Sequence, residues 1–207
     1  MVVDLRRCVG CQTCTIACKQ EHGLPAGTAW RFVADCEIGE YPDVRRVFLP
    51  MQCMHCADPP CVPVCPTGAS RQREDGIVWV RYDACVGCGY CAVACPYRAR
   101  HLVHHADGYF DLPTPAEAET SQPERRGVMT KCTFCKERVD AGRALGLTPG
   151  VDADATPICA VSCIANAIVF GDLDDPGSRV AHLIAEGGAR PLMDECSTQP
   201  SVYYLAD

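Results

Sequence analysis

Sixteen of the eighteen cysteines in this chain of 207 residues fall into four short runs. Run I has the spacing C-x2-C-x2-C-x3-C, run III repeats it, run II widens its middle gap, and run IV carries a long insert between its halves. The runs are Cys8, Cys11, Cys14 and Cys18 (I); Cys53, Cys56, Cys61 and Cys65 (II); Cys85, Cys88, Cys91 and Cys95 (III); and Cys132, Cys135, Cys159 and Cys163 (IV). Such spacings are typical of ligands of cubane iron–sulfur clusters, so the sequence predicts four [4Fe-4S] clusters and a role in electron transfer.

Two other uses of cysteine fit the pattern less well. A disulfide framework is typical of secreted chains, yet the residues before Cys8 contain no apolar stretch that a signal peptide requires. Cysteines only two or three residues apart are also poorly placed for relaxed disulfides. Four-cysteine zinc sites use two separated pairs rather than three cysteines within seven residues. Iron is therefore the expected metal for all sixteen cysteines.

Charge and hydropathy exclude further classes of protein. The formal net charge of −7 argues against a general nucleic-acid binder, which is normally basic. The chain contains no run of eighteen apolar residues, so no direct membrane span is expected. Cysteine inflates the apolar fraction of 48%, so the clusters must replace part of the core and the apo chain should fold poorly.

Local patterns predict a few elements between and after the runs. Asp75-Gly76, followed by the β-prone residues 77–80, indicates a hairpin within residues 70–83, and residues 167–171 resemble a short strand. Short helices are expected after the last cysteine of each run, as at residues 19–23. A longer helix is expected over residues 136–146, ended by Gly146 and followed by a loop to residue 158, and another over residues 179–188.

In two-cluster ferredoxins, paired runs exchange their fourth cysteines. Applied in sequence order, this rule pairs run II with run III and run I with run IV. The predicted ligand sets are set 1 (Cys8, Cys11, Cys14, Cys163), set 2 (Cys18, Cys132, Cys135, Cys159), set 3 (Cys53, Cys56, Cys61, Cys95) and set 4 (Cys65, Cys85, Cys88, Cys91).

The predicted fold is thus α+β and loop-rich, with two bacterial 2[4Fe-4S] ferredoxin-like units stabilised by their clusters and the second inserted within the first. Residues 1–49 and 127–177 form the outer unit, and residues 50–106 form the inserted one. Residues 107–126, rich in Pro, Glu, Ser and Thr, are expected to be a surface loop. Residues 178–207 form a tail that packs back on the body or docks on a partner, and packing back is favoured.

Several motifs give the chain a family resemblance. Tyr41-Pro42, the segment from Pro50 to Cys56, Cys65-Pro66-Thr67-Gly68-Ala69 and Lys131-Cys132-Thr133-Phe134-Cys135 are among them, and the likeness extends over nearly the whole chain. In these segments the chain resembles the four-cluster iron–sulfur (beta) subunits of molybdopterin oxidoreductases, the dimethyl sulfoxide, polysulfide, thiosulfate and tetrathionate reductase group. It departs from their pattern at Ile164-Ala165-Asn166-Ala167, where Pro-Thr-Gly-Ala is usual, and in the long insert at residues 136–158.

The resemblance implies a subunit without catalytic residues of its own. It would relay single electrons between a Mo- or W-pterin catalytic subunit and a quinone-reactive membrane-anchor subunit or another acceptor. A cluster subunit of a hydrogenase or formate dehydrogenase complex and a freestanding soluble polyferredoxin are the alternatives. The expected location is the cytoplasm, or the cytoplasmic membrane through partners; co-export to the periplasm with a signal-bearing catalytic subunit is the alternative.

Other residues near the runs have candidate roles. Gly10, Gly87 and Gly89 would let backbone N–H groups approach cluster sulfurs. Charged side chains beside the runs either raise cluster potentials or are merely solvated: Arg6, Arg7, Lys19, Arg98, Lys131 and Lys136. His101, His104 and His105 are expected to have structural or surface roles, and His55 to pack or hydrogen-bond near a cluster. Cys36 and Cys196 are expected to be free and buried.

Overall fold

The computed structural model describes residues 1–105, 108–110, 112–120 and 122–206, which form short helices and strands joined by long loops. Residues 106, 107, 111 and 121, in or beside the predicted surface loop, and residue 207 of the tail lie outside the described residues. The strands are β1 (Val2–Asp4), β2 (Phe32–Ile38), β3 (Arg45–Met51), β4 (Ser70–Gln72), β5 (Val78–Val80), β6 (His101–Leu102), β7 (Met129–Thr130), β8 (Ile168–Val169), β9 (Arg190–Pro191) and β10 (Tyr203–Leu205).

Helices are equally short. The α-helices are α1 (Thr13–Glu21), α2 (Tyr90–Val93), α3 (Pro115–Thr120), α4 (Lys136–Ala144), α5 (Ile158–Val161) and α6 (Arg179–Ala185). Single 3₁₀ turns occur at η1 (Tyr82–Ala84), η2 (Pro123–Arg125), η3 (Ala153–Ala155) and η4 (Asp194–Cys196). This mixed α/β content agrees with the predicted fold class.

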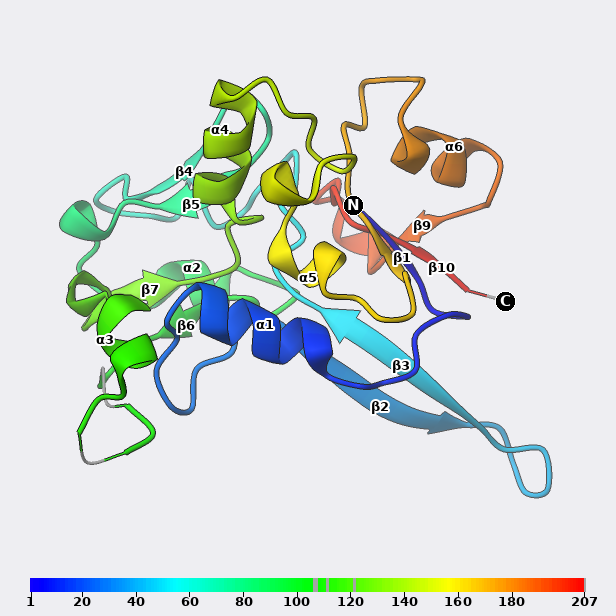
Figure 1. The fold of residues 1–207 in the computed structure, drawn as a ribbon, viewed down its shortest axis with the longest axis horizontal. Helices are drawn as coiled ribbons and strands as arrows, with labels where there is room; N and C mark the ends of the chain where they lie inside the picture. Colours follow the sequence, from blue (N-terminus) through cyan, green and yellow to red (C-terminus); the bar gives the residue numbers. More distant parts are fainter. Residues whose placement is uncertain (106–107, 111, 121, 207) are drawn as a thin grey trace.

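A four-stranded sheet joins the two ends of the chain (Figure 1). Its strand order is β8-β1-β10-β9, and β1 pairs in parallel with β10, so that Val3 lies opposite Tyr204. Helix α6 packs against this sheet through Val180, which is fully buried with Val2 and Leu205. The tail therefore packs back on the body, because its apolar strand completes the sheet that begins at the N-terminus.

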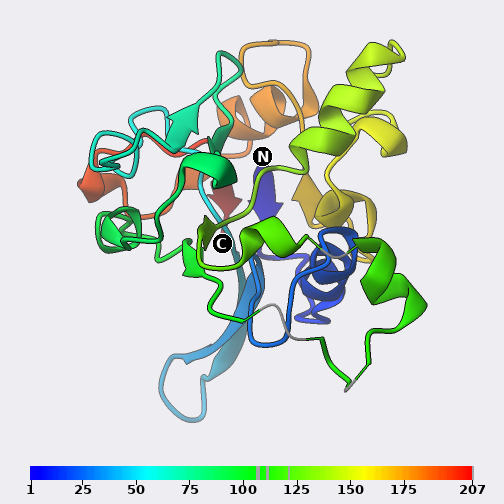
Figure 2. The same cartoon turned by 90° about the vertical axis from the view of Figure 1, so that its left-hand side faces the viewer.

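A second β-structure protrudes from the body. Strands β2 and β3 form an antiparallel hairpin in which Phe32 pairs with Met51 and Ile38 with Arg45. The far end of this hairpin extends away from the body in both views (Figures 1 and 2). Its base lies beside run I, where Gln12 Nε2 donates a hydrogen bond to the Val33 carbonyl oxygen at 3.0 Å. This hairpin was not predicted from the sequence.

Several predicted elements are confirmed. Strands β4 and β5 form the hairpin around Asp75-Gly76, with Ser70 opposite Val80. Strand β8 occupies the predicted strand at residues 167–171, and α4 begins at Lys136 as predicted. It ends at Ala144, and the positive φ of Gly146 (76°) fits a helix stop.

Two expectations about local structure were wrong, the first of them in part. Short helices do not generally follow the last cysteine of a run: α2 ends before Cys95 and α5 ends before Cys163, although α1 continues past Cys18 to Glu21, in part as predicted for residues 19–23. The cysteine loops turn directly into helices, so each helix begins inside its run. The segment predicted as a surface loop, residues 107–126, contains α3 and η2, and its Arg125 is buried.

The main core contains many cysteine side chains among its apolar groups. Its buried members include Met1, Val3, Trp30, Met54, Phe134, Val202 and Tyr204 together with Cys14, Cys18, Cys53, Cys56, Cys132 and Cys159. The Trp30 indole donates a hydrogen bond to Thr130 Oγ1 at 2.9 Å, so this large side chain is both packed and satisfied. The cysteines thus belong to the structural centre of the molecule.

Shortening the Leu205 side chain on β10 should destabilise the protein. Leu205 is 1% exposed and packs beneath α6, so we expect Leu205→Ala to lower the free energy of unfolding by about 2–5 kcal/mol. An anaerobic Tm measurement checks this. Leu145→Ala, at a leucine that is 78% exposed, is the matched control and should change the free energy by less than about 0.5 kcal/mol. Equal effects of the two variants would contradict the packing described here.

Candidate metal centres

The cysteines of set 1 line one cavity. Cys8, Cys11 and Cys14 approach it from the loop before α1 and from the first turn of α1, and Cys163 approaches from the loop after α5. Apolar side chains, among them Val33 and Ile168, complete its walls. The structure thus brings together residues that lie about 150 positions apart in the sequence, as run pairing requires.

The cysteines of set 2 are all buried. Burial raises the pKa of the Cys18 thiol, and the neighbouring sulfurs of Cys132 and Cys159 raise it further. The pKa of Cys135 is raised in the same way, by burial first and then by Cys159 and Cys132. These mutual effects show that the sulfurs of this set lie near one another. A buried thiol in such a group loses its proton only where a metal centre or another cation balances the negative charge of the thiolate.

The cysteines of set 3 line another cavity, together with Val78, Tyr97 and Arg100. Cys53, Cys56 and Cys61 come from run II, and Cys95 comes from the end of run III. Arg100 Nη2 donates a hydrogen bond to Cys61 Sγ at 2.7 Å. This cavity and that of set 1 fit a cubane cluster, because each offers four thiols on walls that are otherwise largely apolar.

The cysteines of set 4 are more exposed. Burial is the main cause of the raised pKa of Cys91. Arg100 opposes this rise, and the nearby Cys61 and Cys85 add to it. Cys65 Sγ accepts a hydrogen bond from the Ser70 backbone N–H at 3.4 Å, while Cys88 is exposed. The structure therefore places Cys91 near Cys85 and also near Cys61 of set 3.

Backbone N–H groups point at several of the sulfurs. Met129 donates to Cys85 at 3.4 Å, Phe134 to Cys132 at 3.5 Å and Ala167 to Cys163 at 3.3 Å. Burial raises the pKa of Cys8, and a hydrogen bond from the Gly10 backbone opposes that rise. Gly10 therefore acts as the sequence analysis expected. Such donors stabilise negative charge on sulfur and so raise the potential of a bound cluster.

Most of the cations singled out from the sequence bond to other groups. Arg6 forms an ion pair with Asp4, Lys136 one with Glu137, and Lys19 Nζ donates to the carbonyl oxygens of Pro25 and Thr28. Lys131 is buried beside run IV and donates to the Cys132 carbonyl oxygen at 2.6 Å. Arg7 and Arg98 are exposed.

The cations that contact cysteine sulfur are Arg31 and Arg100, and the sequence analysis missed both. Arg31 lies thirteen positions after Cys18, and Arg100 lies five positions after Cys95. Neither belongs to a run, and no sequence pattern marks them out. Only the fold shows that their side chains point inward.

The histidines divide into buried and surface groups. His55 is 1% exposed; its Nδ1 accepts the Val78 N–H at 3.0 Å, and its ring stacks on Phe134 with centroids 3.7 Å apart. The packing and hydrogen bonding expected of His55 are thus confirmed. His104 and His105 are exposed, and burial lowers the pKa of the half-buried His101, which agrees with ordinary structural and surface roles.

His22 is a site residue that the sequence analysis did not identify. Its Nε2 lies 3.2 Å from Cys135 Sγ, within the buried environment of set 2. Burial, and then the nearby Arg125, lower the pKa of His22 to about 4. The neutral ring can therefore donate its Nε2–H to this sulfur at physiological pH. A histidine after a helix gives no sequence signal for such a contact.

Cys36 and Cys196 are both exposed, so the expectation of buried free cysteines was wrong. Cys36 lies on the protruding hairpin and Cys196 lies in the single turn η4. Within the described residues, no three His, Cys, Asp or Glu side chains converge closely enough to hold a single metal ion. No helix of the described chain is long and apolar enough to cross a membrane.

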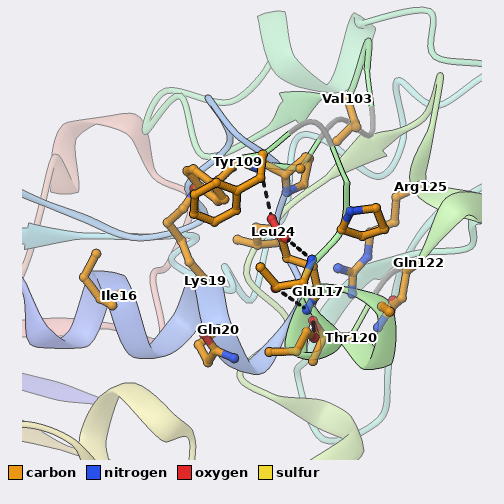
Figure 3. A pocket seen from close by; sticks show the side chains of 18 residues that line it. Ile16, Lys19, Gln20, Leu24, Val103, Tyr109, Glu117, Thr120, Gln122 and Arg125 are labelled. Carbon is orange, nitrogen blue, oxygen red and sulfur yellow. Dashed lines mark hydrogen bonds between the residues drawn. The ribbon is translucent and has the colours of Figure 1, made fainter.

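A cavity of about 680 Å³ lies apart from the cysteines, between α1 and the segment that contains α3 (Figure 3). Lys19, Leu24, Tyr109 and Arg125 are among its lining residues, and none of the described lining residues is a cysteine. Glu117 orders one wall, because its carboxylate accepts the backbone N–H groups of Tyr109 and Thr114, each at 2.8 Å.

Comparison with known proteins identifies the class. Residues 44–108, which contain runs II and III, match the family model of the 4Fe-4S dicluster domain. This match favours iron–sulfur clusters over the zinc alternative for the inner runs. The protein is thus an iron–sulfur protein with a ferredoxin-like dicluster domain.

The whole chain also has curated relatives. It is 40% identical to a selenate reductase subunit of Mesobacillus selenatarsenatis, over 99% of this chain and 70% of that one. It is 39% identical to a tetrathionate reductase subunit of Salmonella typhimurium, over 99% and 71% of the two chains. It is 34% identical to the iron–sulfur subunit of the arsenate respiratory reductase of a Shewanella species, over 99% and 94%. The chain belongs to the family of iron–sulfur subunits of molybdopterin oxidoreductases, and is a non-catalytic electron-transfer subunit.

Two glycines in run III provide a matched test of the loop geometry. Both have positive φ, but a Cβ on Gly87 would lie 2.3 Å from the Gly127 carbonyl oxygen, whereas a Cβ on Gly89 would meet nothing within 4 Å. Alanine at either costs about 1–2 kcal/mol of backbone strain. We expect Gly87→Ala to cost more and to lower the iron content per chain further than Gly89→Ala. Anaerobic iron analysis and Tm measurements check this, and equal losses would show that strain alone decides.

Proposed function

We propose that the chain holds four [4Fe-4S] clusters on sets 1 to 4 and relays electrons along them in that order. The observation that carries this proposal is the exposure of the cysteines. All of set 2 is buried, as is set 3 apart from the half-buried Cys95, whereas sets 1 and 4 each have one exposed member, Cys11 and Cys88. A row with shielded inner members and open ends suits a relay between two partners.

Electrostatic effects between neighbouring sets support the order. Cys14 of set 1 is among the groups that raise the pKa of Cys159 in set 2, after burial as the main cause. Cys53 of set 3 likewise contributes to the raised pKa of Cys132 in set 2, where burial again dominates. Cys61 of set 3 affects the pKa of Cys91 in set 4. Each set thus has sulfurs close to the next set along the row.

The residues around the clusters would set the path of the electrons and the cluster potentials. Each bound cluster would supply one-electron redox chemistry. Backbone N–H groups and the His22 ring stabilise negative charge on the sulfurs. Apolar walls keep water away from the inner sets, which limits the reorganisation that accompanies a change of charge.

The two open ends are the proposed docking faces. Exposed apolar side chains flank Cys11 and Cys163 at one end, namely Val9, Ile16 and Ile164, and others flank Cys88 at the other, namely Val86, Tyr90 and Val93. Exposed apolar patches of this kind mark protein interfaces. One end would receive a Mo- or W-pterin catalytic subunit, and the other a quinone-reactive membrane subunit or another acceptor, which would hold the chain at a membrane through its partners.

The nested two-unit fold belongs to the same proposal. Runs II and III lie in the matched dicluster segment, between runs I and IV. Strands β6 and β7 pair residues that follow run III with residues that precede run IV, so the chain returns to the outer unit at that point.

Purification from the native host under anaerobic conditions tests the function. A pterin-containing subunit should co-purify with the chain, and reduced substrate or quinol should bleach the visible absorption of the clusters in the complex. Recovery of the chain alone, fully loaded with iron, would contradict the role of a docked relay.

Cysteine substitutions test the ligand sets. We expect Cys163→Ser to abolish or alter the same EPR signal as Cys8→Ser, and Cys18→Ser to affect the signal that Cys135→Ser affects, with a loss of up to about four of about sixteen iron atoms per chain. Cys36→Ser and Cys196→Ser are the controls and should leave iron and spectra unchanged, because both thiols are exposed outside the runs. If Cys18→Ser altered the Cys8 signal instead, the runs would not exchange cysteines.

A further inference from the structure

Two buried arginines contact cysteine sulfur and have no carboxylate partner among the described residues. Arg31 is 2% exposed and Arg100 is 6% exposed. A guanidinium remains protonated in proteins, and a buried charge is costly unless an opposite charge and hydrogen-bond acceptors surround it. The groups around these two side chains therefore indicate which negative charges they are built to meet.

Arg31 faces sulfur. Its Nη1 lies 3.5 Å from Cys159 Sγ and 4.0 Å from Met1 Sδ, whereas Nε and Nη2 are buried without a hydrogen-bond partner among the described residues. Burial lowers the pKa of Arg31, but the sulfurs of Cys159 and Cys14 raise it by more. Cys14 belongs to set 1 and Cys159 to set 2, so this cation lies between two of the proposed clusters.

Arg100 has the equivalent place in the other half of the row. Its Nη2 lies 2.7 Å from Cys61 Sγ and 2.7 Å from Ser70 Oγ, and its Nη1 is buried without a partner among the described residues. Burial lowers its pKa, and Cys61, Cys53 and Cys91 outweigh that effect. Cys61 and Cys53 belong to set 3 and Cys91 to set 4. Each pair of sets therefore encloses one arginine with unused N–H donors.

We propose that Arg31 sets the reduction potentials of the clusters on sets 1 and 2 together, and that Arg100 does the same for sets 3 and 4. This inference rests on the four-cluster function proposed above. A fixed positive charge in a medium of low dielectric constant stabilises the more negative, reduced form of a nearby cluster and so raises its potential. Because one cation acts on two clusters, it raises both potentials together and changes the driving force for electron transfer within the pair little.

The test is a redox titration of each cluster by EPR in the complex purified from its host. We expect Arg31→Gln to lower the potentials of clusters 1 and 2 and leave those of clusters 3 and 4 unchanged, and Arg100→Gln to do the reverse. At a fixed solution potential near the midpoint, the ratio of reduced to oxidised cluster should fall at least about tenfold, which corresponds to about 59 mV for one electron. Unchanged potentials, or equal shifts in all four clusters, would overturn the proposal.

Matched controls separate local placement from net charge. Arg7→Gln and Arg98→Gln remove an exposed arginine directly before run I and shortly after run III, so they change the formal charge by the same amount. They should leave all potentials nearly unchanged. Shifts as large as those of the buried variants would show that net charge is the cause and would overturn the proposal.

Lysine variants test the role of charge, and an iron count tests whether the clusters are bound. Arg31→Lys and Arg100→Lys keep the charge and should retain most of the potential, whereas a fall equal to that of the glutamine variants would overturn a role for charge. If a glutamine variant lost iron, the lysine variant at the same position would be the test, and a large fall in its cluster potentials despite the retained charge would overturn the proposal. Wild-type complex with fewer than four clusters in this chain would refute the function proposed above, whereas four clusters with unshifted potentials would refute only the role of the arginines.

Discussion

The burial of thiol sulfur is the constraint on which the rest of the structure depends. Cys18, Cys132, Cys135 and Cys159 are all buried, and burial raises their pKa values; repulsion from the neighbouring sulfurs of Cys132 and Cys159 raises those of Cys18 and Cys135 further. No apolar packing satisfies such a group, because sulfur that carries charge needs either a metal centre or a nearby cation. The surrounding helices and strands are short, and they bring cysteines from distant runs to one place.

The rest of the molecule compensates for the weakness of these short elements. Helices of four to nine residues and strands of two to seven are at best marginally stable alone in water. The four-stranded sheet unites the first residues, the segment after run IV and the tail, and Tyr204 reaches from it to the Pro50 carbonyl oxygen with a hydrogen bond of 2.9 Å. This contact ties the sheet to the segment that leads into run II. The cysteine loops are thereby fixed from several sides.

Sequence reasoning predicted the chemistry better than the scaffold. Cysteine spacing identified the cofactor class, because few other centres use three cysteines within seven residues, and Asp75-Gly76 marked the β4–β5 hairpin, because that turn chemistry is local. The parallel pairing of β1 with β10 could not be predicted, since strands of three residues lack a periodic signal and their partner lies at the opposite end of the chain. Arg31, Arg100 and His22 were missed for a related reason. Their role depends on where a loop side chain points, which no spacing rule records.

The position of β10 has a consequence for how the protein is made. Strand β1 pairs in parallel with β10, which lies about 200 positions later in the sequence, and the Met1 amino group donates a hydrogen bond to the Ser201 carbonyl oxygen. The sheet that closes the body therefore cannot form before β10 has been synthesised. Until then Val2 and Val3, both fully buried in the folded protein, lack one of the two strands that flank them. Delivery of iron and sulfide before that moment would meet an open and incompletely ordered polypeptide.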